Sequence, residues 1–277
     1  MENQQDKWLS VYLFHHGDAN QLLKQLVHPF IMQWPLPWFF IRYWEGGDHI
    51  RLRLKATEKQ HHLIVNSLRA ENPVIKAIQI AEYEPEVQRY GNLESMPWAE
   101  RYFECSSAHI LNWIVNKQTN QSLIAQAIKL HLTLLFATGW NEKALIKVCN
   151  LFLEGWLPKL FNQTESKEIQ RLFWLNQFET IFRKSKPQMV AAADQFWQAL
   201  KAGDVDDDLN TYLSETISIL KHYKSAGFEE HKLFQIISSF MHMNNNRLGV
   251  SNNEEAYIIY GVISCLQFIK TPAHSFK

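Results

Sequence analysis

Basic and aromatic side chains alternate along residues 38–54, WFFIRYWEGGDHIRLRL. Aromatic and β-branched residues on both sides of a Glu-Gly-Gly-Asp stretch predict a β-hairpin with a two-residue turn at Gly46 and Gly47. Successive side chains of a strand point to opposite faces. His49, Arg51 and Arg53 therefore share one face of the hairpin, which we call the arginine face.

The predicted turn also sets the pairing across the hairpin. It places Trp44 opposite His49, Arg42 opposite Arg51 and Phe40 opposite Arg53, so that Arg42 joins the arginine face. The opposite face is then a core face with Phe39, Ile41, Tyr43, Ile50, Leu52 and Leu54. Like charges directly across a strand pair repel one another. We infer that the arginine face binds an anion, either a carboxylate or a phosphate; a solvated strand face is the alternative.

Two further segments carry polar groups beside predicted elements. The segment 83–91, YEPEVQRYG, brings Glu84, Glu86 and Arg89 to the end of a strand. The segment 240–249, FMHMNNNRLG, spans the end of one predicted helix and the start of the passage to the next. His242 is expected at the helix end, facing a polar loop over 244–247 that contains Arg247. A structural histidine that is hydrogen-bonded to the loop is the alternative interpretation.

The sequence offers no pattern for a metal or a cofactor. His15-His16 and His61-His62 lack a third ligand at metal spacing. The three cysteines, Cys105, Cys149 and Cys265, form no CxxC pair, which argues against a disulfide framework and a zinc site. GxSxG, Walker-type and GxGxxG motifs are missing. We therefore predict neither a metal nor an organic cofactor.

The bulk composition of the 277 residues limits the protein class. Lys+Arg and Asp+Glu both number 28, which weakens the case for a nucleic-acid-binding protein. The N-terminal MENQQDKW has no signal-peptide pattern, and no apolar run approaches the roughly 18 residues of a membrane span. The expectation is a cytoplasmic protein without direct nucleic-acid contacts and without a membrane span.

The first 85 residues or so alternate between strand and helix patterns. Strands are predicted at Trp8–His16, in the hairpin and at Val74–Glu84. A helix capped by Asp18, with Leu22, Leu23, Leu26 and Val27 as its apolar stripe, lies between the first two strands, and Pro29, Pro35 and Pro37 are expected to interrupt the passage that follows it. A helix over 58–72, capped by Thr57, buries Leu63, Ile64 and Leu68. The order β-α-β-β-α-β is the ferredoxin-like pattern.

From about Pro97 onward the patterns are helical. Helices are predicted at 98–117, 123–137, from Asn141 towards Trp156, and near 165–183, 187–202, 209–226, 229–243 and 253–269. Gly139 is expected to end the second of these, and Ser251 with Glu254 predicts a capping box for the last. The fold class is α+β, with a ferredoxin-like part at 1–92 and a mostly helical part at 93–277 that completes the active site.

Three stretches together resemble a known family. They are the FFIRYW-turn-HIRLR hairpin, the YEPEVQRYG segment with the helix carrying Glu100, Phe103 and Ser106-Ser107, and the late HMNNNRLG. From Trp8 to about Leu266 the chain resembles the C-terminal glutamate-elimination domain of class I lanthipeptide dehydratases. Stand-alone members are called thiopeptide-type bacteriocin biosynthesis proteins.

The resemblance implies a β-elimination. In that family, glutamate is removed from glutamylated Ser or Thr of a ribosomal precursor peptide, which leaves dehydroalanine or dehydrobutyrine. By motif, the family's functional residues fall on Arg51, Arg53, Arg89 and His242. We further expect Arg42, His49, Tyr90 and Arg247 to contact the substrate.

The resemblance also implies partners and leaves alternatives open. The expected partners are the glutamylated precursor peptide and a separate protein with a glutamylation domain, and a homodimer is left open. Enzymes that close a pyridine ring in thiopeptides share the fold and are one alternative. A non-catalytic subunit that binds the leader peptide by strand addition is the other.

Overall fold

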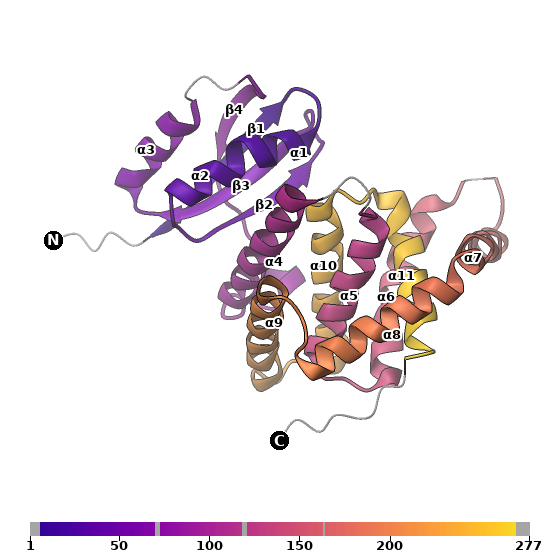
Figure 1. The fold of residues 1–277 in the computed structure, drawn as a ribbon. Helices are drawn as coiled ribbons and strands as arrows, with labels where there is room; N and C mark the ends of the chain where they lie inside the picture. The colour runs from indigo at the N-terminus through magenta and orange to yellow at the C-terminus, as the bar shows by residue number, and fades with distance from the viewer. Residues whose placement is uncertain (1–5, 70–72, 118–120, 163, 270–277) are drawn as a thin grey trace. The chain divides into compact units, whose positions relative to one another are not determined.

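The computed structural model describes residues 6–69, 73–117, 121–162 and 164–269. It divides the chain into two compact units, which are described separately. Unit 1 comprises residues 1–87 and 99–119, and unit 2 comprises residues 88–98 and 120–277. The predicted α+β class is confirmed: a small antiparallel sheet lies in unit 1, and helices make up unit 2 (Figure 1).

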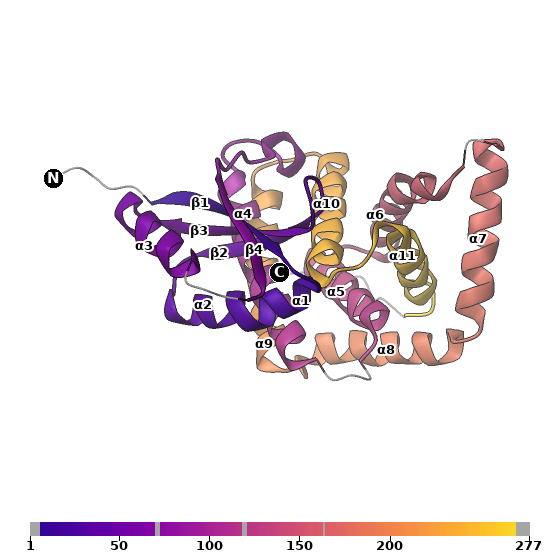
Figure 2. The ribbon, with the colours of Figure 1, turned by 90° about the horizontal axis from the view of Figure 1, so that it is seen from above.

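Unit 1 contains a four-stranded antiparallel sheet with the order β2-β3-β1-β4. Its strands are β1 (Lys7–His15), β2 (Trp38–Tyr43), β3 (His49–Ala56) and β4 (Ile75–Ala81). Helices α1 (Ala19–Leu22), α2 (His28–Gln33) and α3 (Glu58–Arg69) cover one face of this sheet (Figures 1 and 2). This is the predicted β-α-β-β-α-β order.

Local signals fix the ends of these elements. The Asp18 carboxylate accepts a hydrogen bond from the backbone N–H of Asn20 and caps α1. Thr57 and Gln60 bond reciprocally at the start of α3, as in a capping box. The prediction that Pro29 interrupts the chain was wrong, because a π-helical turn at 23–27 leads into α2 and Pro29 occupies its first turn, where no N–H is needed. The prediction that Leu63 is buried was also wrong, because its side chain is 59% exposed on the outer side of α3.

Most of helix α4 (Met96–Asn116) belongs to unit 1 and borders the edge strand β2. The Ser107 hydroxyl accepts a hydrogen bond from the backbone N–H of Phe40, at 3.2 Å. The Phe39 and Phe103 rings are 5.3 Å apart. An edge strand offers unpaired backbone groups, and Ser107 uses one of them.

Unit 2 is built around four helices that pack on one another, α5 (Leu123–Thr138), α6 (Glu142–Trp156), α10 (Glu230–Leu248) and α11 (Asn252–Leu266). Helices α7 (Lys167–Arg183), α8 (Lys186–Ala202) and α9 (Asp207–Ser225) surround them (Figure 2). A 3-10 turn at Leu157–Leu160 lies in unit 2, and most of a second one, Val87–Tyr90, does so as well. Among the described residues, no helix is long and apolar enough to cross a membrane.

The predicted caps of unit 2 are confirmed at three helices. Gly139 ends α5 in the left-handed conformation, with φ 61°. The Asn141 side chain accepts from the N–H of Ala144 at the start of α6. Ser251 and Glu254 form the capping box of α11. These are local interactions, which the sequence encodes within four residues.

Helix α10 is longer than the sequence pattern predicts. It continues to Leu248 and ends at Gly249, with φ 83°. The predicted loop at 244–247 and the position of His242 at a helix end were therefore wrong. Asparagine favours turns over helix interiors, but here Asn244 donates to the Tyr212 hydroxyl and Asn245 to the Glu255 carboxylate. These hydrogen bonds from other helices outweigh the weak local preference.

Candidate active site

The hairpin of unit 1 has a different register from the one predicted. Five residues, Trp44–Asp48, connect the strands, with Gly46 and Gly47 at φ 79° and 111° and a backbone hydrogen bond from Gly47 to Trp44. Tyr43 therefore pairs with His49, and Ile41 with Arg51. A shift of one residue moves every side chain of a strand to the other face.

This shift changes which β2 residues share the arginine face. Phe39, Ile41 and Tyr43 lie on it, and the prediction that they form the core face was wrong. Trp38, Phe40 and Arg42 lie on the opposite face, which the helices cover, so the predicted pairings of Trp44, Arg42 and Phe40 were wrong as well. His49, Arg51 and Arg53 share a face as predicted, because they alternate within one strand.

Arg42 is bound on the helical side of the sheet. Its Nη2 donates to the Asn20 side-chain oxygen at 2.7 Å. Burial lowers the pKa of Arg42 to about 10, and the nearby Asp18 carboxylate partly offsets this effect. Arg42 is therefore on the other face of the sheet from Arg51. Its contact with the substrate stays a prediction and is not part of the function proposed below.

Aromatic rings hold the Arg51 guanidinium. Its Cζ lies 3.3 Å from the Tyr43 ring centroid and 4.7 Å from that of Tyr12, on strand β1. Its Nε donates to the His49 ring at 3.4 Å. Rings attract a cation without neutralising it, so Arg51 keeps its charge while its position is fixed.

Arg53 is buried without a carboxylate partner. Its side chain is 5% exposed, between the Tyr12 and Tyr83 rings. Its Nε and Nη1 have no hydrogen-bond partner among the described residues, and within those residues no ion pair joins Arg51 or Arg53 to an acidic group. Burial lowers the pKa of Arg53, and the nearby Arg51 charge adds to this effect. An anion bound here would relieve both penalties.

His49 acts on Arg51 as a neutral ring. Burial lowers the pKa of His49, and the charges of Arg51 and Arg53 lower it further. Its Nδ1 lies 2.7 Å from the carbonyl oxygen of Gly47, which makes Nδ1 the protonated nitrogen and leaves Nε2 to accept from Arg51. His49 thus orients Arg51; its predicted contact with the substrate stays a prediction.

In unit 2, His242 lies in the interior of α10 and is held by a carboxylate. Its Nδ1 is 2.9 and 3.2 Å from the two oxygens of Glu255, on α11. The side-chain amide of Asn245, one turn further along α10, donates to the same carboxylate at 3.1 Å. The His242 ring also stacks on the Trp156 ring, with centroids 4.5 Å apart. We call these four residues the His242 cluster.

Cations lie beside the His242 cluster within unit 2. The Lys159 ammonium is 3.3 Å from the Trp156 ring centroid. Burial lowers the pKa of Lys159, the Glu255 charge raises it and the Arg89 charge lowers it again. Arg89 donates from Nε to the Ser239 hydroxyl on α10, at 3.2 Å. Arg89 therefore bonds to the helix that carries His242, three residues before it, although the sequence separates Arg89 and His242 widely.

Two predicted site residues are buried in unit 2. Tyr90 is 3% exposed; its ring stacks on Phe240, and its carbonyl oxygen accepts from the Tyr223 hydroxyl. Arg247, in the last turn of α10, is 0% exposed. Their substrate-binding roles stay predictions and are not carried further, because neither side chain has open access to solvent.

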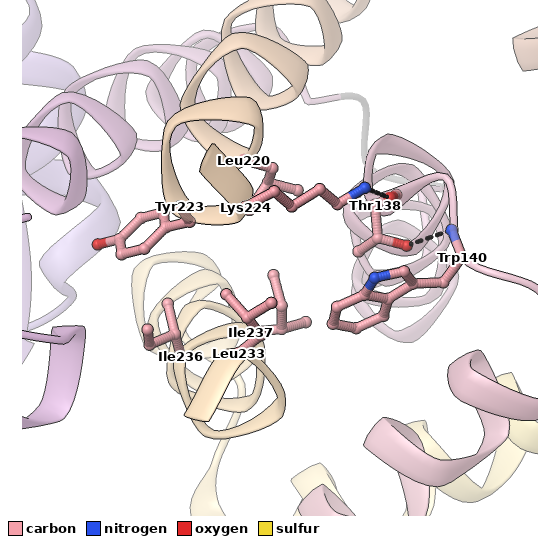
Figure 3. Close-up of a pocket in the computed structure, with 8 residues that line it drawn as sticks. All are labelled: Thr138, Trp140, Leu220, Tyr223, Lys224, Leu233, Ile236 and Ile237. Atoms are coloured by element: carbon pink, nitrogen blue, oxygen red, sulfur yellow. Dashed lines mark hydrogen bonds between the residues drawn. The ribbon is translucent and has the colours of Figure 1, made fainter. Parts of the chain in front are cut away.

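An apolar pocket of unit 2 lies apart from all these residues. It is lined by side chains of α5, α9 and α10 and by Trp140 (Figure 3). Its polar groups already have partners: the Lys224 ammonium donates to the Thr138 carbonyl oxygen, and the Thr138 hydroxyl accepts from the N–H of Trp140 (Figure 3). None of the predicted site residues lines it, so it is not the candidate active site.

Comparison with known proteins identifies the family. A family model described as "Lantibiotic biosynthesis dehydratase C-term" matches residues 8–265. The chain belongs to this family. It is 27% identical over 237 residues to the nisin biosynthesis protein NisB of Lactococcus lactis subsp. lactis, and 24% identical over 235 residues to the subtilin biosynthesis protein SpaB of Bacillus subtilis. Each match covers 80% of this chain and 21% of the relative, so the chain spans about a fifth of their length.

Solved structures share the fold. The tRNA-dependent lantibiotic dehydratase MibB from Microbispora sp. 107891 matches with a TM-score of 0.64 and 18% identity, over 94% of this chain and 28% of MibB. The pyridine synthase TbtD from thiomuracin biosynthesis matches with a TM-score of 0.69 and 12% identity, over 94% of this chain and 97% of TbtD. TsrL matches with a TM-score of 0.70 and 11% identity, over 95% of this chain and 94% of TsrL. At these identities the likeness concerns the fold.

Two groups of site residues were not predicted from the sequence. Tyr12 and Tyr43 hold Arg51, but Tyr12 lies on a strand that is distant in sequence, and Tyr43 was placed on the wrong face. Glu255 holds His242 from the next helix, 13 residues later. The sequence signal for Glu255 was its place beside Glu254 in a capped first turn, which by itself indicates only helix capping.

Proposed function

We propose that this chain catalyses β-elimination of glutamate from glutamylated Ser or Thr residues of a ribosomal precursor peptide. The reaction leaves dehydroalanine or dehydrobutyrine, as in lanthipeptide or thiopeptide biosynthesis, and makes the chain a carbon–oxygen lyase. The observation that carries the proposal is the pair Arg51 and Arg53. Both are guanidinium groups held by aromatic rings without a carboxylate partner among the described residues, at positions that match the family's hairpin motif.

Elimination requires a base and a place for negative charge. A base removes the proton from Cα, and the C–H electron pair passes through an enolate to form the Cα=Cβ bond. The Cβ–O bond then breaks, and glutamate leaves with that electron pair on its carboxylate. Positive charge near the enolate and the leaving carboxylate stabilises both, and a positioned base contributes typically 10²- to 10⁴-fold in rate.

We assign these tasks to residues on the basis of their surroundings. Arg51 and Arg53 bind the glutamyl carboxylate and the enolate oxygen, because their charges are fixed and not already paired. His242 exchanges the proton, because its ring is held in one orientation and remains 16% exposed. Arg89 helps to fix the peptide. The reaction as written calls on these side chains, without a step that passes through a cofactor.

The partners follow from the same chemistry. The substrate already carries glutamate, so a separate protein must glutamylate the precursor peptide before this chain acts on it. MibB is described as tRNA-dependent, and we propose that a partner performs the corresponding step for this chain. We place both proteins in the cytoplasm, where charged tRNA is available.

The experiment is incubation of the purified chain with a glutamylated precursor peptide, followed by mass spectrometry. Dehydrated peptide together with free glutamate supports the proposal. Unchanged peptide, at a protein concentration that binds it, contradicts it. Arg51→Ala and His242→Ala serve as slow variants in which the glutamylated peptide is expected to accumulate.

Pyridine formation is the second candidate. It is favoured by one observation, the match to TbtD over 97% of that chain, whereas the match to MibB covers 28%. The same protein is incubated with a peptide that already contains two dehydroalanines. Ring formation with loss of the leader would select this function, and binding of the leader without a change in mass would select a recognition subunit.

A further inference from the structure

Among the described residues, Glu255 is the only carboxylate that forms a hydrogen bond or an ion pair with the His242 ring. Its side chain is 1% exposed, and both of its oxygens are occupied by His242 and Asn245. The carboxylate lies in the first turn of α11, where a helix favours negative charge. An ionised carboxylate accepts hydrogen bonds and donates none, so the Nδ1 that faces it must carry the proton.

We propose that Glu255 is a positioning residue that keeps His242 in the tautomer with the proton on Nδ1, so that Nε2 is the atom that accepts the substrate proton. Its role in the reaction rests on the proposed elimination, but the tautomer itself does not. Trp156 fixes the plane of the ring by stacking, and Glu255 fixes the rotation of the ring within that plane. Both restraints leave Nε2, on the other side of the ring, with a free lone pair.

Asn245 makes the arrangement sensitive to the chemistry of residue 255. Its amide donates to Oε2 of Glu255, and the His242 Nδ1 faces both carboxylate oxygens. A glutamine at 255 has one acceptor oxygen and one donor amide for these two donors. If its oxygen faces Asn245, its amide faces Nδ1, which must then accept. The proton of His242 moves to Nε2, and the base is lost although the shape of the side chain is almost unchanged.

The other charged and titratable groups beside the ring do not provide this restraint. Lys159 and Arg89 are cations, which cannot accept a proton from Nδ1. His131, on α5, is buried, and burial lowers its pKa to about 4, so it is neutral; neither of its ring nitrogens has a hydrogen-bond partner among the described residues. Glu255 alone among these groups supplies an acceptor for Nδ1.

The test is the tautomer of His242, measured by ¹⁵N NMR of the full chain with labelled histidines. The His242 signals are assigned by their loss in His242→Gln, and spectra are taken at a pH where the ring is neutral. In the wild type we expect a protonated Nδ1 and an unprotonated Nε2. In Glu255→Gln we expect the two nitrogens to exchange these roles. A wild-type ring with its proton on Nε2 overturns the proposal.

Glu254→Gln is the matched control. It removes a carboxylate from the neighbouring position, but glutamine preserves a capping box and Glu254 bonds to Ser251 rather than to His242. We expect the wild-type tautomer in this variant. The wild-type spectrum decides the tautomer even if Glu255→Gln does not fold.

Kinetics with glutamylated peptide then test the role in the reaction. Glu255→Gln should lower kcat on the order of 10²-fold, within the range for loss of a positioned base, while KM changes by less than about 3-fold because the substrate contacts remain. An inverted tautomer with wild-type kcat overturns the positioning role. If the wild type eliminates no glutamate, the proposed function fails, whereas the tautomer remains decided by the spectra.

Discussion

The two units hold their functional side chains in opposite ways. On the arginine face of unit 1, aromatic rings surround Arg51 and Arg53, and within the described residues neither cation is paired with a carboxylate. In the His242 cluster of unit 2, a buried carboxylate and an amide bind the histidine directly. Fixing the position of a charge and directing a lone pair therefore require different neighbouring side chains. Rings leave a cation attractive to an anion, whereas a carboxylate selects which nitrogen of a histidine carries the proton.

The largest expected effect is that of His242→Ala. It removes the base, so kcat for glutamate elimination should fall between about 10²- and 10⁴-fold, while KM for the glutamylated peptide changes little. Steady-state kinetics by mass spectrometry measure both constants. The matched control is His231→Ala, in the exposed first turn of α10, which should keep wild-type kinetics. Equal losses in both variants would show that the effect is a general one on the helix.

Arg51→Ala should change both constants, because Arg51 binds an anion that is present in the substrate as well as in the transition state. We expect kcat to fall on the order of 10²-fold, as for loss of one donor to a developing oxyanion, together with a rise in KM. Lys55→Ala is the control, since Lys55 is a cation two residues further along the same face of β3 and stacks on Trp8. A lower kcat with an unchanged KM would mean that Arg51 does not bind the anion of the substrate, and would contradict the difference between the arginine face and the His242 cluster.

Tyr43→Leu tests whether the rings fix Arg51. Loss of the ring at 3.3 Å from the guanidinium removes a contact of about 1 kcal/mol, and kcat/KM should fall about 5- to 10-fold. Tyr43→Phe keeps the ring and loses the hydroxyl with its hydrogen bond to Glu45, so it should stay within about 2-fold of the wild type. If both variants behave alike, the hydroxyl rather than the ring is what matters.

The smallest effect concerns stability rather than rate. Burial lowers the pKa of His131 to about 4, against an ordinary value of 6.5. The unfolded chain binds a proton at this residue below pH 6.5 and the folded chain does not, so folding loses stability as the pH falls from 6.5 towards 4. Between pH 7 and pH 5 the free energy of unfolding of the wild type should fall by about 2 kcal/mol more than that of His131→Leu. Denaturant unfolding at the two pH values measures this, and parallel losses would contradict it.

The sequence predicts those features that depend on neighbours along the chain. The order of strands and helices in unit 1, the Asp18 and Asn141 caps and the Ser251–Glu254 capping box all follow from residues within four positions of one another. The sharing of one face by His49, Arg51 and Arg53 follows from strand alternation alone. These are the parts of the candidate site that the hairpin sequence determines by itself.

The features that the sequence did not predict depend on distant partners or on loop geometry. His49 pairs with Tyr43 instead of Trp44, and this shift of one residue places Arg42 on the helical face and Tyr43 on the arginine face. Helix α10 runs through its asparagines because Tyr212 and Glu255 satisfy their side chains. The pairing of His242 with Glu255 needs two helices to pack in one register, which no local pattern specifies.

The most direct measurement follows a peptide that is glutamylated on a serine carrying deuterium at Cα. The purified chain alone is incubated with it, and the peptide and free glutamate are quantified over time by mass spectrometry. We predict one equivalent of glutamate for each dehydroalanine formed, with the deuterium lost from the peptide. Return of the unmodified serine peptide with its deuterium retained would mean ester hydrolysis, and would contradict elimination by this chain.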